Sequence, residues 1–224
     1  MWPTSPDELI EAQRALARAT PSPWRPPAGP LAIGACIVVF PRGQTGPGAS
    51  GDAAWASAVV LRGRHLLAEA VVRGLAAGPY VPGLLALREG PPLHSALRAL
   101  AVAPDVLLVD ATGRDHPRRA GLALHLGAIT GLPTVGVTHR PLLADGDWPG
   151  PERGACSSLR LDGERVAAWL RTRRGARPLA VHPGWRTSLE VAVEVVLMAV
   201  RGHRTPAPLR HARQLARVAR GAAG

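Results

Sequence analysis

The sequence contains no lysine and no asparagine, and all 27 of its basic side chains are arginines. It has one tyrosine, one phenylalanine and two cysteines, Cys36 and Cys156. Two cysteines cannot build a disulfide framework, which excludes the small disulfide-stabilised secreted proteins. No uncharged apolar run reaches the roughly 18 to 20 residues that a membrane-spanning helix requires. We therefore do not expect an integral membrane protein.

The N-terminal segment also lacks the pattern of a signal peptide. Its opening residues, MWPTSPDELIEAQ, hold three acidic side chains and no basic stretch followed by an apolar one. We expect no export, and the two cysteines fit a reducing cytoplasm. The composition, 46% apolar and 19% charged over 224 residues, excludes a disordered chain and predicts one well-packed domain over residues 1–224, which we expect to be monomeric.

Acidic residues are few, and the excess of arginine is uneven. Residues 1–112 hold 9 arginines and 8 acids, whereas residues 113–224 hold 18 arginines and 8 acids. The net charge of +11 therefore lies almost entirely in the C-terminal half. A GC-rich genome explains arginine in place of lysine but not this asymmetry, which favours a polyanionic partner, most simply nucleic acid. Four arginines at helical spacing form either a nucleic-acid-binding face or a solvated one: Arg210, Arg213, Arg217 and Arg220.

The first part of the chain is expected to form a helix and three strands. Residues 6–18 have helical apolar spacing, and a Pro-rich connector completes the N-terminal segment 1–30. A Gly-rich stretch, 41–54, is expected to be a flexible loop. The turn Arg62-Gly63-Arg64 predicts an antiparallel hairpin. The three β-like runs cover residues 31–40, 57–63 and 65–74.

After residue 80, helical and strand-like segments alternate. This order predicts an α/β fold of the ribonuclease H-like class, with a mixed sheet of three antiparallel strands and then parallel strands, flanked by helices. We expect strands at DVLLVD (105–110), TVGVT (134–138) and PLAV (178–181), and helices at 92–102, about 119–130, 164–174, 187–200 and 207–220.

Polar residues follow two of these strands. Asp110 ends one strand and His139 follows the next, so both are expected at the carboxyl edge of the sheet, where sites gather in α/β folds. The segment from Gly113 to Arg119 opens a helix and carries His116 with three arginines. Such a helix start favours a bound phosphate, although a polar loop before a helix explains it equally well.

Glu89 and Tyr80 are further candidates in the segment PYVPGLLALREGP. Glu89 is an acid in an apolar context, which indicates either a functional carboxylate or a solvated turn residue. Tyr80 stands between Pro79 and Pro82. A stiffened aromatic tip on a basic protein can act as a wedge between stacked bases, or the ring can pack in the core.

These segments together resemble endonuclease V. The likeness is strongest in PYVPGLLALREGP and DVLLVDATGRDHPRRAGLALHLGAITGLPTVGVTHRPL. It continues through EAQRALA, GACSSL, RTRRGARPLAVHPGWRTSLEVAVEVV and PLRHARQLAR, over about 200 of the 224 residues. The resemblance implies a ribonuclease H-like fold and a magnesium- or manganese-dependent endonuclease. Such an enzyme recognises deaminated purines, chiefly inosine, in DNA or RNA and cuts one linkage beyond the lesion on its 3′ side.

The resemblance also implies roles for individual residues. Glu89 and Asp110 would be metal ligands, because hard oxygen donors suit magnesium, and His116 would lie beside the scissile bond. A strand-separating wedge would be formed by Tyr80, Val81 and Pro82. A pocket for the flipped base would be lined by Gly83, Leu85, Ala111, Gly121, Leu122 and Leu142, and phosphates would be bound by Arg118, Arg119, His139 and Arg140.

The sequence departs from the family at several of these positions. Cys36 stands where the first strand carries a metal-binding aspartate, and a thiol is a poor ligand for magnesium. Asp52, in the following Gly-rich loop, is the acid that could replace it. His139 stands in place of a lysine, with Arg140 beside it as a partial substitute. Ala111 replaces a glycine, and Thr112 and Trp185 replace histidines, so we expect the changes to cluster around the site.

Three hypotheses follow from this combination. The chain is a metal-dependent endonuclease with weakened or altered specificity, or a catalytically inactive protein that retains the fold and binds nucleic acid. The third is a scaffold retained for a protein–protein or biosynthetic role, in which the arginines are merely compositional. Cleavage of inosine-containing strands with and without manganese separates the first hypothesis from the others.

Overall fold

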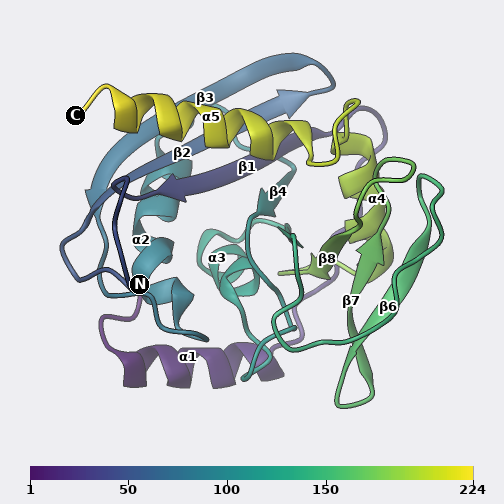
Figure 1. Ribbon diagram of the computed structural model, residues 1–224, viewed down its shortest axis with the longest axis horizontal. Helices are drawn as coiled ribbons and strands as arrows, with labels where there is room; N and C mark the ends of the chain where they lie inside the picture. The colour runs from purple at the N-terminus through teal and green to yellow at the C-terminus, as the bar shows by residue number, and fades with distance from the viewer. Residues whose placement is uncertain (224) are drawn as a thin grey trace.

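The strands of the protein form one mixed sheet of eight, in the order β3-β2-β1-β4-β5-β8-β7-β6 (Figure 1). The computed structural model describes residues 1–223. The α/β class and the ribonuclease H-like arrangement predicted from the sequence are confirmed. The strands are β1 (Ala32–Val39), β2 (Ala53–Arg62), β3 (His65–Leu75), β4 (Val106–Val109), β5 (Thr134–Thr138), β6 (Cys156–Leu161), β7 (Glu164–Leu170) and β8 (Leu179–Pro183).

The first half of the sheet follows the sequence pattern closely. β2 and β3 form the predicted antiparallel hairpin, turning at Gly63, whose φ of 63° suits glycine. β1 pairs antiparallel with β2 and parallel with β4, and β4 pairs parallel with β5. Cys36 lies opposite Val109 in this register. The carboxyl ends of three strands therefore meet at one edge, where Asp110 and His139 follow β4 and β5.

The second half corrects one prediction. Residues 164–174 do not form a helix, because β7 occupies most of this segment between β6 and β8. The Asp162-Gly163 pair, with φ values of 51° and 81°, makes the tight hairpin turn that joins β6 to β7. An Asp-Gly pair between strands is a strong hairpin signal. The helical propensity of the Ala- and Arg-rich sequence is outweighed here by strand pairing on both sides.

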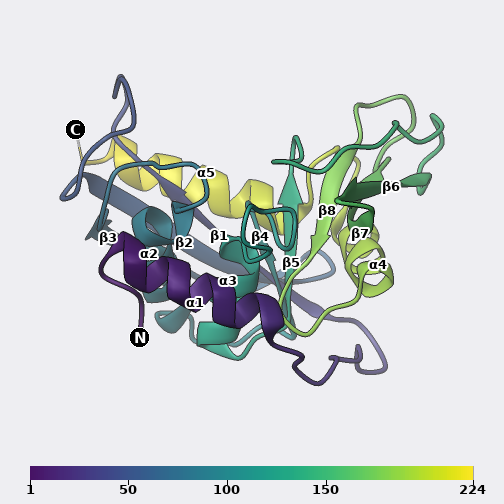
Figure 2. The same cartoon turned by 90° about the horizontal axis from the view of Figure 1, so that it is seen from below.

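Helices cover both faces of the sheet. α4 and α5 pack in one core cluster against one face, while α1, α2 and α3 pack against the other. Figure 2 shows α5 on the opposite side of the strands from α1, α2 and α3. α1 begins where the Ser5 hydroxyl accepts a hydrogen bond from the Glu8 amide, a typical N-terminal cap. The helices are α1 (Pro6–Arg18), α2 (Leu85–Arg98), α3 (Leu122–Thr130), α4 (Leu189–Ala199) and α5 (Ala207–Gly221). Within residues 1–223, no helix is both long and apolar enough to cross a membrane.

α2 differs from the expected helix at 92–102, because it begins seven residues earlier and contains Pro91 and Pro92. A proline inside a helix costs about 3 kcal/mol in the absence of compensation. Here the first turns are buried against the sheet, and the ring of Trp2 lies so close to Gly90 that an added Cβ would clash with it. Tertiary packing thus sustains the helix through the prolines. As a consequence, Glu89 lies on a helix packed against the sheet rather than in a turn.

Candidate nucleic-acid site at the edge of the sheet

Two cavities meet beside Asp110 at the carboxyl edge of the sheet. The first, which we call the Gly83 cavity, has a volume of about 160 Å³. The second, the Cys36 cavity, has a volume of about 200 Å³ and is bordered by Cys36, Glu89 and Asp110. Tyr80, Leu85 and Asp110 border both. The Gly83 cavity is lined mainly by Gln13, Gly83, Ala111, His116, Leu122 and Leu142.

The carbonyl oxygen of Gly83 fixes one wall of the Gly83 cavity. It accepts three hydrogen bonds, from Gln13 Nε2 at 3.0 Å, His116 Nε2 at 3.1 Å and Arg118 Nη2 at 2.7 Å. Gly83 has a φ of 77°, which favours glycine. Gln13 also accepts from Arg118 Nε, so α1 contributes directly to the wall. The sequence comparison included EAQRALA but gave this buried glutamine no role.

His116 is neutral and fully bonded. Its Nδ1 accepts from the Arg118 amide at 3.2 Å, so its proton lies on Nε2 and is donated to Gly83. Burial, together with the positive charge of Arg118, lowers the pKa of His116 to about 4. Both ring nitrogens are engaged within the protein. The geometry therefore gives His116 a positioning role at the cavity wall and leaves no ring nitrogen free to exchange a proton with a substrate.

Asp115 positions the opposite wall. Its carboxylate is fully buried and accepts hydrogen bonds from three consecutive amides, those of Leu142, Leu143 and Ala144, at 2.6 to 2.8 Å. These bonds hold Leu142 at the cavity. Sequence inspection placed Asp115 only within a polar run. A buried carboxylate needs hydrogen-bond donors, and this requirement is the signal that could have marked Asp115 as a structural residue of the site.

Tyr80 is exposed at the rim and is not a core residue, since 47% of its surface is accessible. Its amide donates to the Pro47 carbonyl at 2.7 Å, and Arg88 bonds the carbonyls of Gly78 and Ala49. Arg88 also forms an ion pair of 2.9 Å with Asp52. The loop that carries Tyr80 and the Gly-rich loop are thereby cross-linked. The Asp52 carboxylate is engaged by Arg88 and lines neither cavity, so it does not add a ligand beside Cys36.

The Cys36 cavity brings the predicted ligand positions together. Cys36 is only 1% exposed, and burial, with the nearby carboxylates of Glu89 and Asp110, raises the pKa of its thiol far above neutrality. Glu89 is partly buried, and its burial and the charge of Asp110 raise its pKa to about 8. At neutral pH the cavity thus holds a neutral thiol and one carboxyl that favours its protonated form.

Asp110 already has a cationic partner. Arg213 on α5 donates from Nη2 to Asp110 Oδ2 at 2.6 Å. Nowhere in residues 1–223 are three or more His, Cys, Asp or Glu side chains grouped as a metal site would need. Magnesium and manganese prefer several oxygen donors. A neutral thiol, a carboxyl with raised pKa and a carboxylate paired with arginine do not fit such an ion.

The predicted phosphate-binding residues do not lie together in the structure. Arg118 faces the Gly83 cavity wall, whereas Arg119 forms ion pairs with Asp162 at 2.9 Å and Glu164 at 3.7 Å, which engage its guanidinium. His139 and Arg140 are exposed beyond β5. Partial burial of its ring and the positive charge of nearby Arg204 lower the pKa of His139, which favours the neutral ring at pH 7.

Two other positions lie away from the cavities. Gly121 caps the start of α3, and a Cβ there would clash with the backbone oxygen of Thr112, so it supports the Gly83 cavity without lining it. Trp185 contacts Thr134 at the start of β5, the end of the strand opposite His139. The expectation that the departures all cluster around the site is therefore wrong for Trp185, because β8 runs antiparallel to β5. Thr112 does line the Gly83 cavity.

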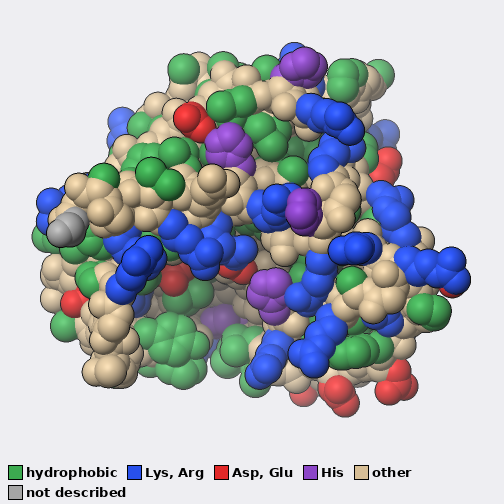
Figure 3. All heavy atoms as spheres, turned by 45° about the horizontal axis from the view of Figure 1, so that its top comes forward, with side chains coloured by type: hydrophobic (Ala, Val, Ile, Leu, Met, Phe, Trp, Pro, Cys, Tyr) green, Lys and Arg blue, Asp and Glu red, His purple; other side chains and the backbone are tan. Residues whose placement is uncertain are grey.

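A basic groove adjoins the site along α5. It has a volume of about 640 Å³ and is lined by Arg42, Arg210, Arg213 and Arg217. Figure 3 shows arginine side chains gathered around a hollow in which a few acidic side chains are visible. Arg220 differs from the other arginines of α5, since it donates to the Phe40 carbonyl at 2.9 Å. Positive charge next to a cavity is the arrangement that a polyanionic strand requires.

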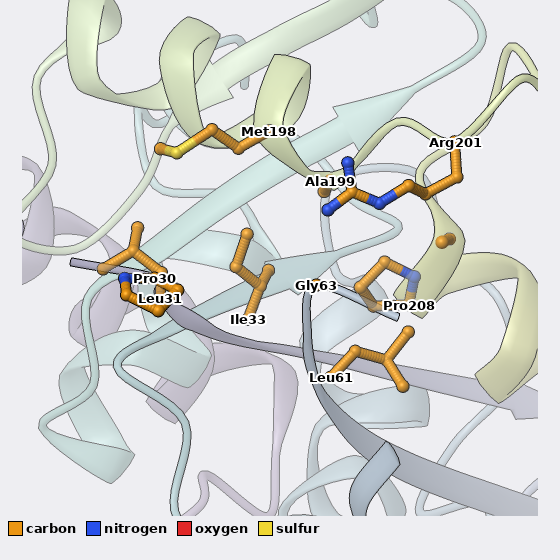
Figure 4. Close-up of a pocket in the computed structure, with 10 residues that line it drawn as sticks. Pro30, Leu31, Ile33, Leu61, Gly63, Met198, Ala199, Arg201 and Pro208 are labelled. Carbon is orange, nitrogen blue, oxygen red and sulfur yellow. The ribbon is translucent and has the colours of Figure 1, made fainter. Parts of the chain in front are cut away.

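A further cavity of about 240 Å³ lies near the start of β1 (Figure 4). Leu31, Ile33, Leu61 and Met198 make its lining mainly apolar, and Arg201 is its charged member. It is at the end of β1 away from Asp110, because β1 and β4 run parallel. It contains no carboxylate and takes no part in the site described above.

A mixed sheet with this strand order, and with carboxylates at the carboxyl edge of its parallel strands, defines the ribonuclease H-like class of nucleic-acid-processing proteins. Within that class, the chain belongs to the endonuclease V family, whose model matches residues 45–214. The resemblance seen in the sequence is thereby confirmed. Proteins of this family are nucleases.

Individual relatives agree with this assignment. Endonuclease V of Roseiflexus castenholzii is 46% identical over 171 residues, which are 75% of this chain and 77% of that protein. The crystal structure of Endonuclease V from Streptomyces avermitilis is 36% identical, with a TM-score of 0.88 over 99% of this chain and 96% of that one. A Ciona intestinalis Endonuclease V, in complex with a 24mer DNA containing an inosine followed by a ribo-adenosine, shares the fold at 21% identity, with a TM-score of 0.79 over 97% and 98% of the two chains.

Proposed function

We propose that this chain binds DNA or RNA strands that contain a deaminated purine, chiefly inosine, and cleaves them weakly or not at all. The observation that carries the proposal is the contrast between an intact cavity for a base and an adjoining site that does not fit a divalent ion. The chain would act by recognising and holding a damaged or edited strand.

The Gly83 cavity has apolar walls and a volume on the scale of one aromatic ring, which supports entry of a base at its rim. An apolar protein cavity of about 150 Å³ can hold a benzene ring, and the Gly83 cavity measures about 160 Å³. Leu85, Leu122 and Leu142 supply apolar walls, and Tyr80 stands exposed at the rim, where a ring can occupy the space of the extruded base. The Ala111 methyl narrows the cavity relative to a glycine.

The basic groove would add electrostatic affinity for the phosphates of the strand. Arg210, Arg213 and Arg217 on α5 face Arg42 across it. Arginine contacts to phosphates give affinity without sequence preference, and a cavity for one base adds selectivity to them. The Ciona relative binds an inosine-containing DNA, which supports the same class of ligand for this chain.

Metal-dependent hydrolysis is the second candidate function, and one observation favours it. Glu89 and Asp110 border the same cavity, and burial together with the charge of Asp110 raises the pKa of Glu89, so the two carboxyl groups are close enough to share a cation. The neutral Cys36 thiol and the Arg213 ion pair oppose it. We therefore place recognition before hydrolysis.

Binding and cleavage can be measured on the same strands. Fluorescence anisotropy with single-stranded DNA and RNA carrying one inosine, and with matched strands carrying adenosine or guanosine, gives the affinity in EDTA, magnesium and manganese. Denaturing gels of the same mixtures show any product. We expect inosine to be preferred equally in all three conditions, with little cleavage. Equal affinity for all strands would overturn the proposal, and efficient cleavage in manganese would establish hydrolysis instead.

A further inference from the structure

We infer that Arg213 is a permanent counter-ion for Asp110. Its guanidinium neutralises the carboxylate in place of a divalent cation, so that strand binding does not depend on metal. The effect on strand binding rests on the proposed function. The competition between an arginine of α5 and a metal ion at Asp110 takes place in the protein itself, without nucleic acid.

The position of Arg213 is set by a rigid helix. Its neighbour Ala212 and the residue one turn further, Ala216, are fully buried against the sheet. The Ser57 hydroxyl on β2 donates to the Ala212 carbonyl at 2.7 Å and ties the helix to the sheet at this point. The guanidinium is thus delivered to Asp110 by packed backbone rather than by a mobile loop. Its side chain is 24% exposed, against 40% for Asp110.

The chemistry of the pair disfavours displacement. An arginine remains charged at any ordinary pH, and its contact with a carboxylate is among the stronger hydrogen bonds in proteins. A divalent cation at Asp110 would have to displace Arg213 or tolerate its positive charge next to it. The Cys36 thiol would give no charge in return, because it is buried and neutral. A single substitution at Cys36 therefore does not suffice to build a strong metal site.

Arg213 also connects the two parts of the surface. It borders the basic groove with Arg210 and Arg217 while one of its nitrogens contacts Asp110. A guanidinium has five N–H donors, so the others remain for a phosphate of a bound strand. The cation that neutralises Asp110 and the cation that contacts the strand would then be the same side chain.

Direct binding of Mn²⁺ to the protein, without nucleic acid, tests the inference. The free-ion signal in electron paramagnetic resonance is titrated with wild type, Cys36→Asp, Arg213→Gln and the double variant. We expect wild type and Cys36→Asp to bind weakly, Arg213→Gln about tenfold more tightly than wild type, and the double variant about a hundredfold more tightly, which is about 2.7 kcal/mol. Arg213→Lys, which keeps the charge, is expected to bind as weakly as wild type.

Arg119→Gln is the matched control. It removes an arginine of similar exposure, 23%, whose guanidinium pairs with Asp162 and Glu164 and which lines neither cavity. We expect it to leave Mn²⁺ binding unchanged, which separates the local effect from the change in net charge. Melting curves show whether each variant folds, and Mn²⁺ is expected to raise the melting temperature of the double variant alone by several degrees.

Two results would overturn the inference. One is Mn²⁺ binding by wild type as tight as that of Arg213→Gln, and the other is a folded double variant that binds no better than wild type. Neither result depends on inosine. A failure of inosine preference would refute the proposed function and leave the competition between Arg213 and metal intact.

Discussion

The Gly83 and Cys36 cavities share three residues but differ in how their polar groups are satisfied. Around the Gly83 cavity, the side chains of Gln13, His116 and Arg118 all donate to one carbonyl. Around the Cys36 cavity, the thiol is buried and neutral and an arginine neutralises Asp110. Under the proposed function, the Gly83 cavity would still receive a base, while the charge available to hold a metal is low in the Cys36 cavity.

If the proposed function is correct, this difference separates recognition from hydrolysis within one fold. A flipped base needs shape, a rim and nearby positive charge, all of which depend on backbone placement and packing. Hydrolysis needs a dense set of oxygen ligands around an ion, which the loss of one charge and the gain of another can remove. Four experiments can break or sharpen the comparison.

The largest effect is expected at Gly83. Gly83→Val adds a branched side chain at a φ of 77°, where its Cβ would lie 3.1 Å from Arg118 Nη2. The resulting shift of Arg118 should distort the cavity wall. We expect the affinity for an inosine strand, measured by anisotropy, to fall about a hundredfold, which is about 2.7 kcal/mol.

Gly131→Val is the control for backbone strain. Gly131 has a φ of 74° and nothing within 4 Å of an added Cβ, and it lies at the end of α3 away from the cavities. We expect a comparable loss of stability without loss of inosine affinity. If both variants bind inosine as wild type does, the Gly83 cavity does not receive the base.

The next effect is on stability, and it has opposite signs at the two cavities. In the folded protein the pKa of His116 is about 4, against an ordinary 6.5. As the pH drops from 6.5 to 4, the unfolded chain takes up this proton before the folded chain does, so the stability of the protein falls. The pKa of Glu89 is about 8 against 4.5, so the folded chain keeps a proton that the unfolded chain loses, and stability falls as the pH rises from 4.5 to 8.

Urea denaturation in EDTA across this pH range measures both contributions. Glu89→Gln should remove the alkaline loss and be more stable than wild type near pH 8 by about 2 kcal/mol, after allowance for partial solvent contact. His116→Gln should flatten the acid limb instead. A Glu89→Gln profile that parallels wild type at every pH would show that Glu89 is ordinarily ionised in the folded protein.

A smaller effect is expected at Tyr80. Stacking of a base on an aromatic ring contributes about 1–3 kcal/mol, so Tyr80→Ala should reduce the preference for inosine over an undamaged strand about tenfold. The melting temperature should barely change, because the side chain is exposed. Trp148→Ala removes another exposed ring, 56% accessible and outside both cavities, and should leave the preference intact. Unfolding of Tyr80→Ala would contradict a role at the rim.

The smallest effect concerns the basic groove. Arg217→Gln should weaken binding severalfold for inosine and control strands alike, and should lower the slope of log affinity against log salt by about 0.7 to 0.9. Arg165→Gln, whose arginine pairs with Glu190 instead, should leave the slope unchanged. Affinity that stays flat between low and physiological salt would show that the arginines of α5 do not contact phosphates.

The sequence by itself determined the class of fold, the family and most of the residues around the cavities. Apolar runs and the turn at Gly63 predicted the first five strands, because local hydrophobic pattern and turn chemistry govern them. Cys36 could be recognised as a departure from position alone. The resemblance to the family singled out Gly83, Leu85, Leu122 and Leu142, but only the fold shows that they line a single cavity.

The tertiary structure alone decided what depends on contacts between distant segments. β7 is a strand because β6 and β8 pair with it on both sides, and α2 continues through two prolines because its first turns are buried. Trp185 lies far from the site because β8 runs antiparallel to β5. The pairing of Arg213 with Asp110, 103 residues apart in sequence, arises because α5 packs across β1 and β2. Sequence spacing fixes the face of a helix, but only packing fixes what that face meets.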